Sequence, residues 1–207
     1  MLTAGELSAA PMLRAITFQS HDTQTGARIG GRPPIGMDQQ FRDKHTQYFG
    51  TFPVENDLEF SIFHRFEIFD DDASRDVIDF NNQILMPSKM IWSIVHKSLP
   101  RDINLPAAFP GLGLGLSDFQ LDHDDVDTDL AERPLVPENK MMGRCYIERH
   151  AVIDDILELE AADFIHLLQI GHDFLVDAEG FPWDPGCLNV WCLDATDPTT
   201  YRFCIQQ

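Results

Sequence analysis

Four segments with the apolar patterning of β-strands constrain the fold of this chain more than any other feature. Between residues 58 and 69, apolar and polar side chains alternate with the period of two expected of a half-buried strand, and only Phe63 and His64 break the pattern. Three later segments are continuously apolar or alternate in the same way, and turn residues separate them. The predicted strands are residues 58–69, 164–170, 188–193 and 201–205.

Two segments have the features of helices. Residues 151–162 carry apolar side chains at the spacing that lines one face of an amphipathic helix. The acidic residues 70–72 predict a turn into a second helix over residues 74–84, because negative charges near the first turn of a helix interact favourably with the helix dipole. Pro87 would prevent this helix from continuing.

The remaining segments are less regular. Residues 14–20 are a candidate short strand, and residues 90–95 fit either a strand or a helix. Paired glycines and prolines predict a loop over residues 26–36, and residues 100–137 are the least regular part of the chain. Three strands near the end of the chain, after segregated helices, predict an α+β fold with antiparallel sheets and a few helices in a single domain over residues 1–207.

The chain is strongly acidic. Lys and Arg total 15 against 34 Asp and Glu, which gives a net charge of −19 with neutral histidines. This charge repels nucleic acids and anionic membranes, and it accelerates encounters with basic proteins. Simple solubility is an equally good explanation of the charge, so both interpretations stay open at this point.

Compositional features favour a location in the cytoplasm. No segment has the roughly 18 consecutive apolar residues of a membrane helix, and the first residues lack the basic start and apolar run of a signal peptide. The four cysteines form no CxxC pair, and three of them lie in apolar, strand-like segments where a free thiol packs as a small hydrophobic group. We therefore expect a reducing compartment, with no disulfide and no structural zinc.

The C-terminal part of the chain carries a recognisable series of motifs. FIHLLQI at residues 164–170 is followed by WDPG at residues 183–186 and by FCIQ at residues 203–206. The series resembles the C-terminal signature of the YwqG-like family, and GGRP at residues 30–33 resembles an early loop of that family. Residues 140–148 depart from the family pattern, since the expected Gly, Pro and Gln are replaced there.

The resemblance implies an α+β fold but no particular chemistry, because the family has no agreed enzymatic activity. Relatives of this kind occur in bacterial toxin neighbourhoods, where an acidic intracellular protein neutralises a secreted effector. The motif residues also have a structural explanation that needs no active site. Gln169 can hydrogen-bond loop backbone, Gly186 permits a tight entry into the next strand, and Trp183 can cap the core.

Two further motifs suggest ligands, but their spacing argues against them. The glycines in GLGLG at residues 111–115 lack the spacing of a nucleotide-binding loop and follow a proline rather than a strand. The acidic segment at residues 122–129 has oxygen ligands suited to calcium. However, in a loop counted from Asp125, Leu130 and Val136 occupy the sixth and twelfth positions, at which an EF-hand requires Gly and Glu.

No catalytic motif stands out. The eight histidines occur in neither an HExxH motif nor a paired Cys/His zinc spacing, and no serine lies in a GxSxG motif. We therefore expect no metal site, no cofactor and no enzymatic activity.

The leading hypothesis is an immunity-type protein that covers the basic active-site cleft of a toxin. Acidic loops would compete for the Lys and Arg groups of such a cleft, and the apolar residues 112–119 would anchor the interface. The candidate partner-binding residues are Asp70, Asp71, Asp72, Asp122, Asp124, Asp125, Asp127 and Asp129.

The alternative hypothesis is a housekeeping protein that binds a small ligand or catalyses an unidentified reaction. Its pocket would lie near His166, Trp183 and Asp184, in the motif region of the chain. Convergent polar groups with perturbed pKa values around a deep pocket would favour this alternative.

Overall fold

In the computed structural model, the strands of one sheet are the main secondary structure of the described residues. The structure describes residues 14–19, 26–42, 44–54, 57–65, 83–105, 107, 111–118, 139–142, 145, 152–171 and 187–206. The strands are β1 (Arg14–Gln19), β2 (Arg28–Ile29), β3 (Gln47–Pro53), β4 (Leu58–His64), β5 (Ile84–Leu85), β6 (Ile91–Lys97), β7 (Leu112–Asp118), β8 (Lys140–Met141), β9 (Ile165–Gly171), β10 (Cys187–Cys192) and β11 (Arg202–Gln206). The α-helix α2 (Ile153–Ala161) and the short 3-10 helices η1 (Asp38–Gln40) and η5 (Pro198–Thr200) complete the described elements.

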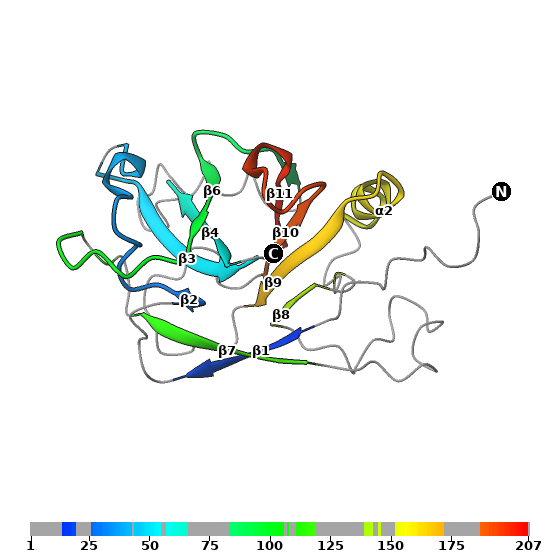
Figure 1. The fold of residues 1–207 in the computed structure, drawn as a ribbon. Coiled ribbons are helices and arrows are strands. Elements are labelled where there is room, and N and C mark those ends of the chain that lie inside the picture. The colour runs from blue at the N-terminus through cyan, green and yellow to red at the C-terminus, as the bar shows by residue number, and fades with distance from the viewer. Residues whose placement is uncertain are drawn as a thin grey trace.

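The strands form one continuous sheet that folds back on itself. Their order across the 11-stranded sheet is β5-β11-β10-β9-β8-β1-β7-β2-β3-β4-β6, and all neighbouring strands in this order pair antiparallel. Figure 1 shows β1 and β7 at the bend, with the two ends of the sheet rising on either side of them. We call β2-β3-β4-β6 the first half of the sheet and β8-β9-β10-β11-β5 the second half.

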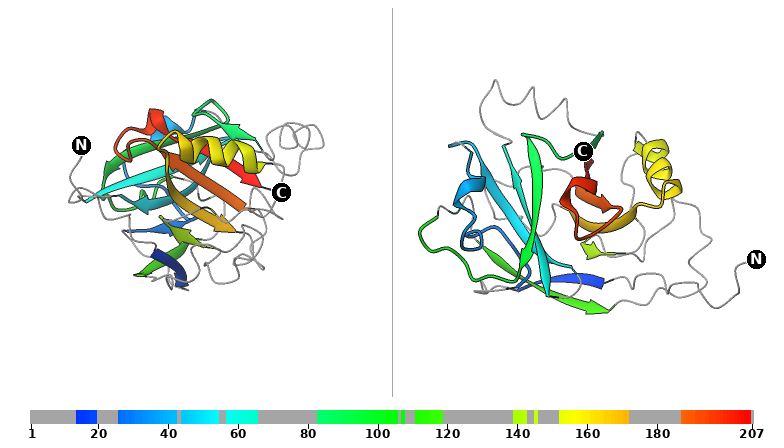
Figure 2. Two further views of the ribbon diagram at one scale, coloured as in Figure 1. Left: turned by 90° about the vertical axis from the view of Figure 1, so that its right-hand side faces the viewer. Right: turned by 45° about the horizontal axis from the view of Figure 1, so that its top comes forward.

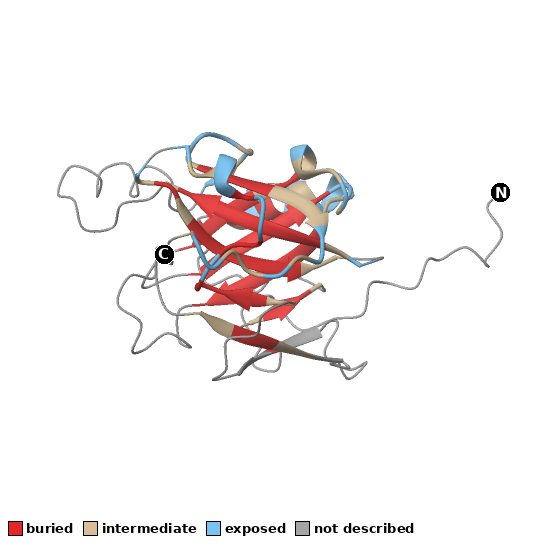
Figure 3. Cartoon of the chain, turned by 60° about the vertical axis from the view of Figure 1, so that its left-hand side comes forward, coloured by how far each residue is buried: buried red, intermediate tan, exposed pale blue. Residues whose placement is uncertain are grey.

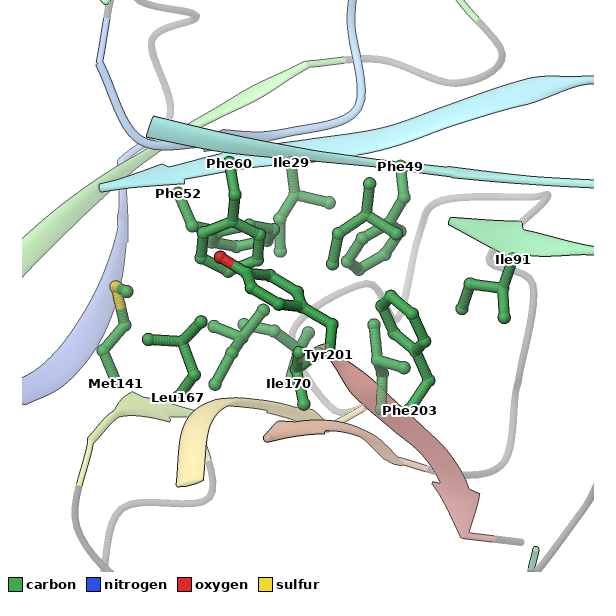
Figure 4. Packing of buried hydrophobic residues seen from close by; sticks show 14 of the residues in the cluster. Ile29, Phe49, Phe52, Phe60, Ile91, Met141, Leu167, Ile170, Tyr201 and Phe203 are labelled. Atoms are coloured by element: carbon green, nitrogen blue, oxygen red, sulfur yellow. The ribbon is translucent and has the colours of Figure 1, made fainter. Parts of the chain in front are cut away.

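The main core lies between the two halves. Figure 4 shows Phe49, Phe52 and Phe60 from the first half facing Ile170 and Tyr201 from the second half. The ring centroids of Phe52 and Phe60 are 5.3 Å apart, and those of Phe60 and Tyr201 are 5.5 Å apart in an edge-to-face arrangement. The burial colours of Figure 3 follow this packing, since the strand interiors are buried and the described exposed segments lie at the periphery.

Each half also buries part of its outer face. On the second half, Val152 and Ile156 of the helical segment pack against Trp191 and Cys204 of the sheet. The two views of Figure 2 show α2 lying beside this half. On the first half, Phe63 stacks on Trp92 at a centroid separation of 5.9 Å, and Met37 packs against the same cluster. Besides the main core, the sheet therefore has a smaller apolar core on the outer face of each half.

The structure confirms the predicted α+β fold with antiparallel sheets. The four predicted strands correspond to β4, β9, β10 and β11, although residues 66–69 of the first one lie outside the described residues. The predicted helix at residues 151–162 is α2, and the candidate strand at residues 14–20 is β1. Residues 91–95 of the ambiguous segment 90–95 belong to β6, and Met90 directly precedes this strand.

Three predictions need correction. The expected loop at residues 26–36 contains β2, and the irregular region at residues 100–137 contains the seven-residue strand β7. β7 escaped detection because glycines occupy the positions between its leucines, and glycine has a low β-propensity. The predicted helix over residues 74–84 is wrong at its end, because Ile84 begins β5, while residues 74–82 lie outside the described part of the chain.

Among the described residues, no helix combines the length and the apolar character needed to cross a membrane.

We expect Phe60→Ala to destabilise the protein by about 3–5 kcal/mol, because the change removes the ring that bridges the two halves and leaves a cavity. The free energy of unfolding from urea denaturation measures this effect. Ile103→Ala is the control, since this side chain is 74% exposed, and we expect a change within about 0.5 kcal/mol. Equal effects of the two substitutions would contradict the packing described above.

His64, at the end of β4, should make stability depend on pH. Desolvation lowers the pKa of this fully buried imidazole from 6.5 to about 3, so the unfolded chain binds a proton that the folded protein excludes. The stabilising contribution is present above pH 6.5 and is lost as the pH falls towards 3. Relative to His64→Gln, the wild type should lose about 1.4 kcal/mol per pH unit in this window, measured by urea denaturation at several pH values. Parallel pH profiles of the two proteins would contradict the assignment.

Candidate functional site

Most of the residues that the sequence singles out for binding lie outside the described residues. These are the eight carboxylates Asp70, Asp71, Asp72, Asp122, Asp124, Asp125, Asp127 and Asp129, together with Trp183 and Asp184. Of the alternative pocket, the structure describes His166 alone. The candidate sites described below therefore come from other residues.

His166 lies on β9 and is held within the outer face of the second half. Its Nε2 is 3.2 Å from Oδ1 of Asn189, and its ring meets Trp191 edge-on at a centroid separation of 5.2 Å. The amide oxygen can only accept a hydrogen bond, so Nε2 carries the proton in this contact. With 4% of its surface exposed, the imidazole is positioned by the sheet rather than presented to solvent.

Asn189 is the centre of a buried network of thiols and amides. The Cys145 thiol donates to Asn189 Oδ1 at 3.1 Å, and Asn189 Nδ2 donates to Cys187 Sγ at 3.0 Å. Gln206 Nε2 lies 3.8 Å from Cys145 Sγ. Burial raises the pKa of Cys145 well above its ordinary range, so the thiol stays protonated and is a poor nucleophile. This network satisfies buried polar atoms and has the character of a structural element.

A second polar network crosses the outer face of the first half. The Tyr48 hydroxyl is 2.6 Å from Thr51 Oγ1, which is 2.7 Å from Ser61 Oγ, which in turn is 2.8 Å from His96 Nε2. His96 Nδ1 is 2.7 Å from the carbonyl oxygen of Lys97. A carbonyl only accepts, so Nδ1 is the donor in this contact, and in the tautomer that carries its proton on Nδ1 alone Nε2 accepts from Ser61. In that tautomer each hydroxyl donates in the same direction, from Tyr48 towards His96.

The contact between Ser61 and His96 has the geometry of an activated serine. A nucleophile and a base within hydrogen-bond distance, with the base oriented by a third group, is the arrangement that nucleophilic catalysis uses. Ser61, however, is fully buried in the sheet, so its oxygen is not presented to a substrate. The Tyr48 hydroxyl is also buried, and desolvation raises its pKa to about 12. We interpret the network as a set of ordered hydrogen bonds that ties β3, β4 and β6 together.

Neither network could be found from the sequence. Their members are scattered between residues 48 and 206, and only the strand register brings them together. The one available signal was the alternation of β4, which places Ser61 on the face opposite the main core.

Carboxylates of α2, of the residues directly after it and of the turn after β10, all exposed except the half-buried Asp197, form a third candidate site, which we call the acidic rim. β9 begins directly after the helical segment, and its first residue, Ile165, pairs with Cys192 at the end of β10, so the two segments meet at one end of the second half. Residues 152–165 and 193–201 contain no Lys, Arg or His. The members of the acidic rim are Asp154, Asp155, Glu158, Glu160, Asp163, Asp194 and Asp197.

Large apolar side chains are exposed among these carboxylates. Leu157, Ile165 and Leu193 are 44%, 41% and 49% exposed. Hydrogen bonds from the backbone and side chain of Thr196 lower the pKa of Asp194, so this carboxylate is charged at neutral pH. Of the three candidate sites, the acidic rim alone combines charge, apolar area and access to solvent.

No family model matches this sequence, and no characterised protein or solved structure is significantly similar to it. The resemblance to the YwqG-like family stays a prediction.

All four cysteines are buried free thiols, and we expect none of them to react in the native protein. Burial raises the pKa values of Cys192 and Cys204 to about 12, so little thiolate forms at mildly alkaline pH. A chromogenic thiol reagent at about pH 8 should detect no fast-reacting thiol in the native protein and four after denaturation without a reductant. A thiol that reacts rapidly before denaturation would contradict the burial described here.

Proposed function

We propose that this protein binds a basic protein partner and neutralises it by covering a cationic surface with the acidic rim. The observation that carries the proposal is the segregation of charge at one end of the second half. Seven carboxylates gather there in segments 152–165 and 193–201, which contain no basic side chain. A surface of one sign attracts a partner of the opposite sign and accelerates association.

The exposed apolar residues of the acidic rim give such a partner something to pack against. Charge alone raises the rate of encounter, whereas a stable complex needs apolar groups that lose contact with water in the interface. Leu157, Ile165 and Leu193 supply this area among the carboxylates. Arg202, which directly follows the second segment, is engaged within the fold, since its guanidinium lies over the Phe164 ring and donates to the Tyr201 carbonyl.

The kind of partner follows from the charge. Enzymes that act on nucleic acids or nucleotides carry basic clefts because they bind phosphate, so a carboxylate-rich surface competes directly for their substrate-binding groups. An immunity protein that neutralises a bacterial toxin of this kind fits both the acidic rim and the function that the sequence resemblance implies. The acidic segments at residues 70–72 and 122–129 add to the net negative charge that attracts a basic partner.

The proposal predicts that Glu158→Gln together with Glu160→Gln will slow association with the partner. The partner is first identified by affinity capture from the native host, and association is then measured with the purified protein at low and high salt. Removing two rim charges should reduce the association rate several-fold at about 50 mM salt and weaken its salt dependence. Folding should be unaffected, because both side chains are exposed and lie away from the N-terminal turn of α2.

Asp38→Asn together with Asp57→Asn is the matched control. These exposed carboxylates belong to the first half of the sheet and its connections, and their removal changes the net charge by the same amount. The control variant should associate faster than the rim variant. Equal rates for the two variants would show that the whole protein's charge, rather than the acidic rim, drives binding.

A further inference from the structure

Two loops on the first half of the sheet lie side by side and form a surface that is separate from the acidic rim. Pro34 and Arg101 pair in an antiparallel bridge, and backbone hydrogen bonds of 2.9 and 2.8 Å flank it. The guanidinium of Arg32 donates to the carbonyl of Ile103, which joins the same two loops. We call the side chains of Arg32, Ile35, Arg101 and Ile103 the basic end.

Both apolar side chains of the basic end are exposed. Ile103 is 74% exposed, the highest value for a large apolar side chain among the described residues, and Ile35 is 42% exposed. Apolar groups that lose contact with water stabilise an interface, so these two side chains are suited to anchor one.

The two loops of the basic end carry the opposite charge to the chain as a whole. Residues 30–37 and 97–105 contain three bases and one carboxylate, so their net charge is +2, whereas that of the whole chain is −19. The Arg32 side chain is exposed and donates to a neutral carbonyl, so no carboxylate among the described residues compensates its charge. The basic end can therefore attract an acidic surface.

The basic end and the acidic rim lie on opposite sides of the protein. Figure 1 shows residues 98–105 beside the first half, whereas α2 lies beyond the second half, and the right-hand view of Figure 2 shows the same separation. Two surfaces placed in this way do not meet within one molecule, but they can meet between two molecules.

We propose that the basic end binds the acidic rim of a second copy of this chain. The two surfaces have opposite charge, and each carries exposed apolar side chains. These are Ile35 and Ile103 on the basic end, and Leu157, Ile165 and Leu193 on the acidic rim. The contact is heterologous, because it joins two different surfaces, so its repetition builds a chain of copies or closes a ring.

The net charge of the protein opposes this contact, but salt limits the distance over which it acts. At about 0.15 M salt, exposed charges interact little beyond about 8 Å. Opposite charges that face each other in the contact are closer than this distance, so their attraction is retained while repulsion between the rest of the two copies is screened. We therefore expect a reversible association that depends on protein concentration.

Self-association of this kind covers the surface to which we assign the basic partner. A second copy and the partner then compete for the acidic rim, so a high concentration of this protein slows binding of the partner. This consequence rests on the proposed function, whereas the self-association itself does not.

The test is sedimentation velocity of the whole protein at about 0.15 M salt and at about 10–1,000 μM protein, where contacts with micromolar to millimolar dissociation constants are detected. We expect the sedimentation coefficient of the wild type to rise with concentration. Arg32→Glu together with Ile103→Glu should weaken association at least about tenfold, because the variant loses both the charge and an apolar anchor.

Glu158→Lys together with Glu160→Lys should weaken association from the other side of the contact. Both side chains are exposed, and this variant has a smaller net negative charge than the wild type, so general repulsion cannot explain its weaker association. Lys44→Glu together with Gln83→Glu is the matched control for the basic end. It changes exposed side chains elsewhere and shifts the net charge by the same amount, so it should associate like the wild type.

A mixture of the two variants identifies the contact. The variant of the basic end keeps an intact acidic rim, and the rim variant keeps an intact basic end. The mixture should therefore associate at concentrations at which neither variant does so alone. If Arg32→Glu prevents folding, Ile103→Glu alone takes its place, because this side chain is the most exposed of the basic end.

Three results would overturn the proposal. The first is a wild type that stays monomeric throughout, which would leave the basic end to a different acidic molecule. The second is association of either variant at the level of the wild type, and the third is a mixture that gains nothing over the separate variants. The experiment contains no other protein, so its failure leaves the proposed binding of a basic partner untouched.

Discussion

The packing of the two halves of the sheet against each other determines where every other feature of this protein can lie. Phe49, Phe52 and Phe60 meet Ile170 and Tyr201 across the fold, so the inner face of nearly every long strand must be apolar. Polar strand residues are consequently placed on the outer faces, where cross-strand neighbours hydrogen-bond to one another. The network from Tyr48 to His96 and the network around Asn189 are both products of this constraint. The protein is organised as a dry interior between two polar but partly covered surfaces.

The distribution of charge follows from the same arrangement. Arg28 and Lys140 are fully buried, whereas the carboxylates of α2 face solvent. A chain with a net charge of −19 reduces its self-repulsion when carboxylates are exposed and hydrated. Negative charge is therefore less destabilising in the acidic rim than it would be in the interior. The exposed Leu157, Ile165 and Leu193 distinguish the acidic rim from a surface that only carries hydrated charges. Arg28 presents the opposite case, a positive charge enclosed by the sheet.

The sequence predicted the parts of the fold that depend on local pattern. The alternation in β4 and the apolar runs of β9 and β10 are visible without any knowledge of their partners. β2 has only two residues, and β7 replaces its outer side chains with glycine, so both depend on ladder partners far away in the sequence. The candidate sites were harder to predict from the sequence than the strands. The carboxylates of α2 could be assigned to a helix, but only the pairing of β9 with β10 brings Leu193 and Asp194 beside them.

The strand order has a consequence for the rate at which this protein folds. β3 with β4, and β9 with β10 and β11, join strands that are near one another in the sequence. The bend is different, because β1 pairs with β7 on one side and with β8 on the other, and both lie much later in the chain. Contacts between distant segments require long loops to close before any stabilising interaction forms, which slows folding. We therefore expect the local hairpins to form early and the first strand to insert last, closing the two halves into one sheet.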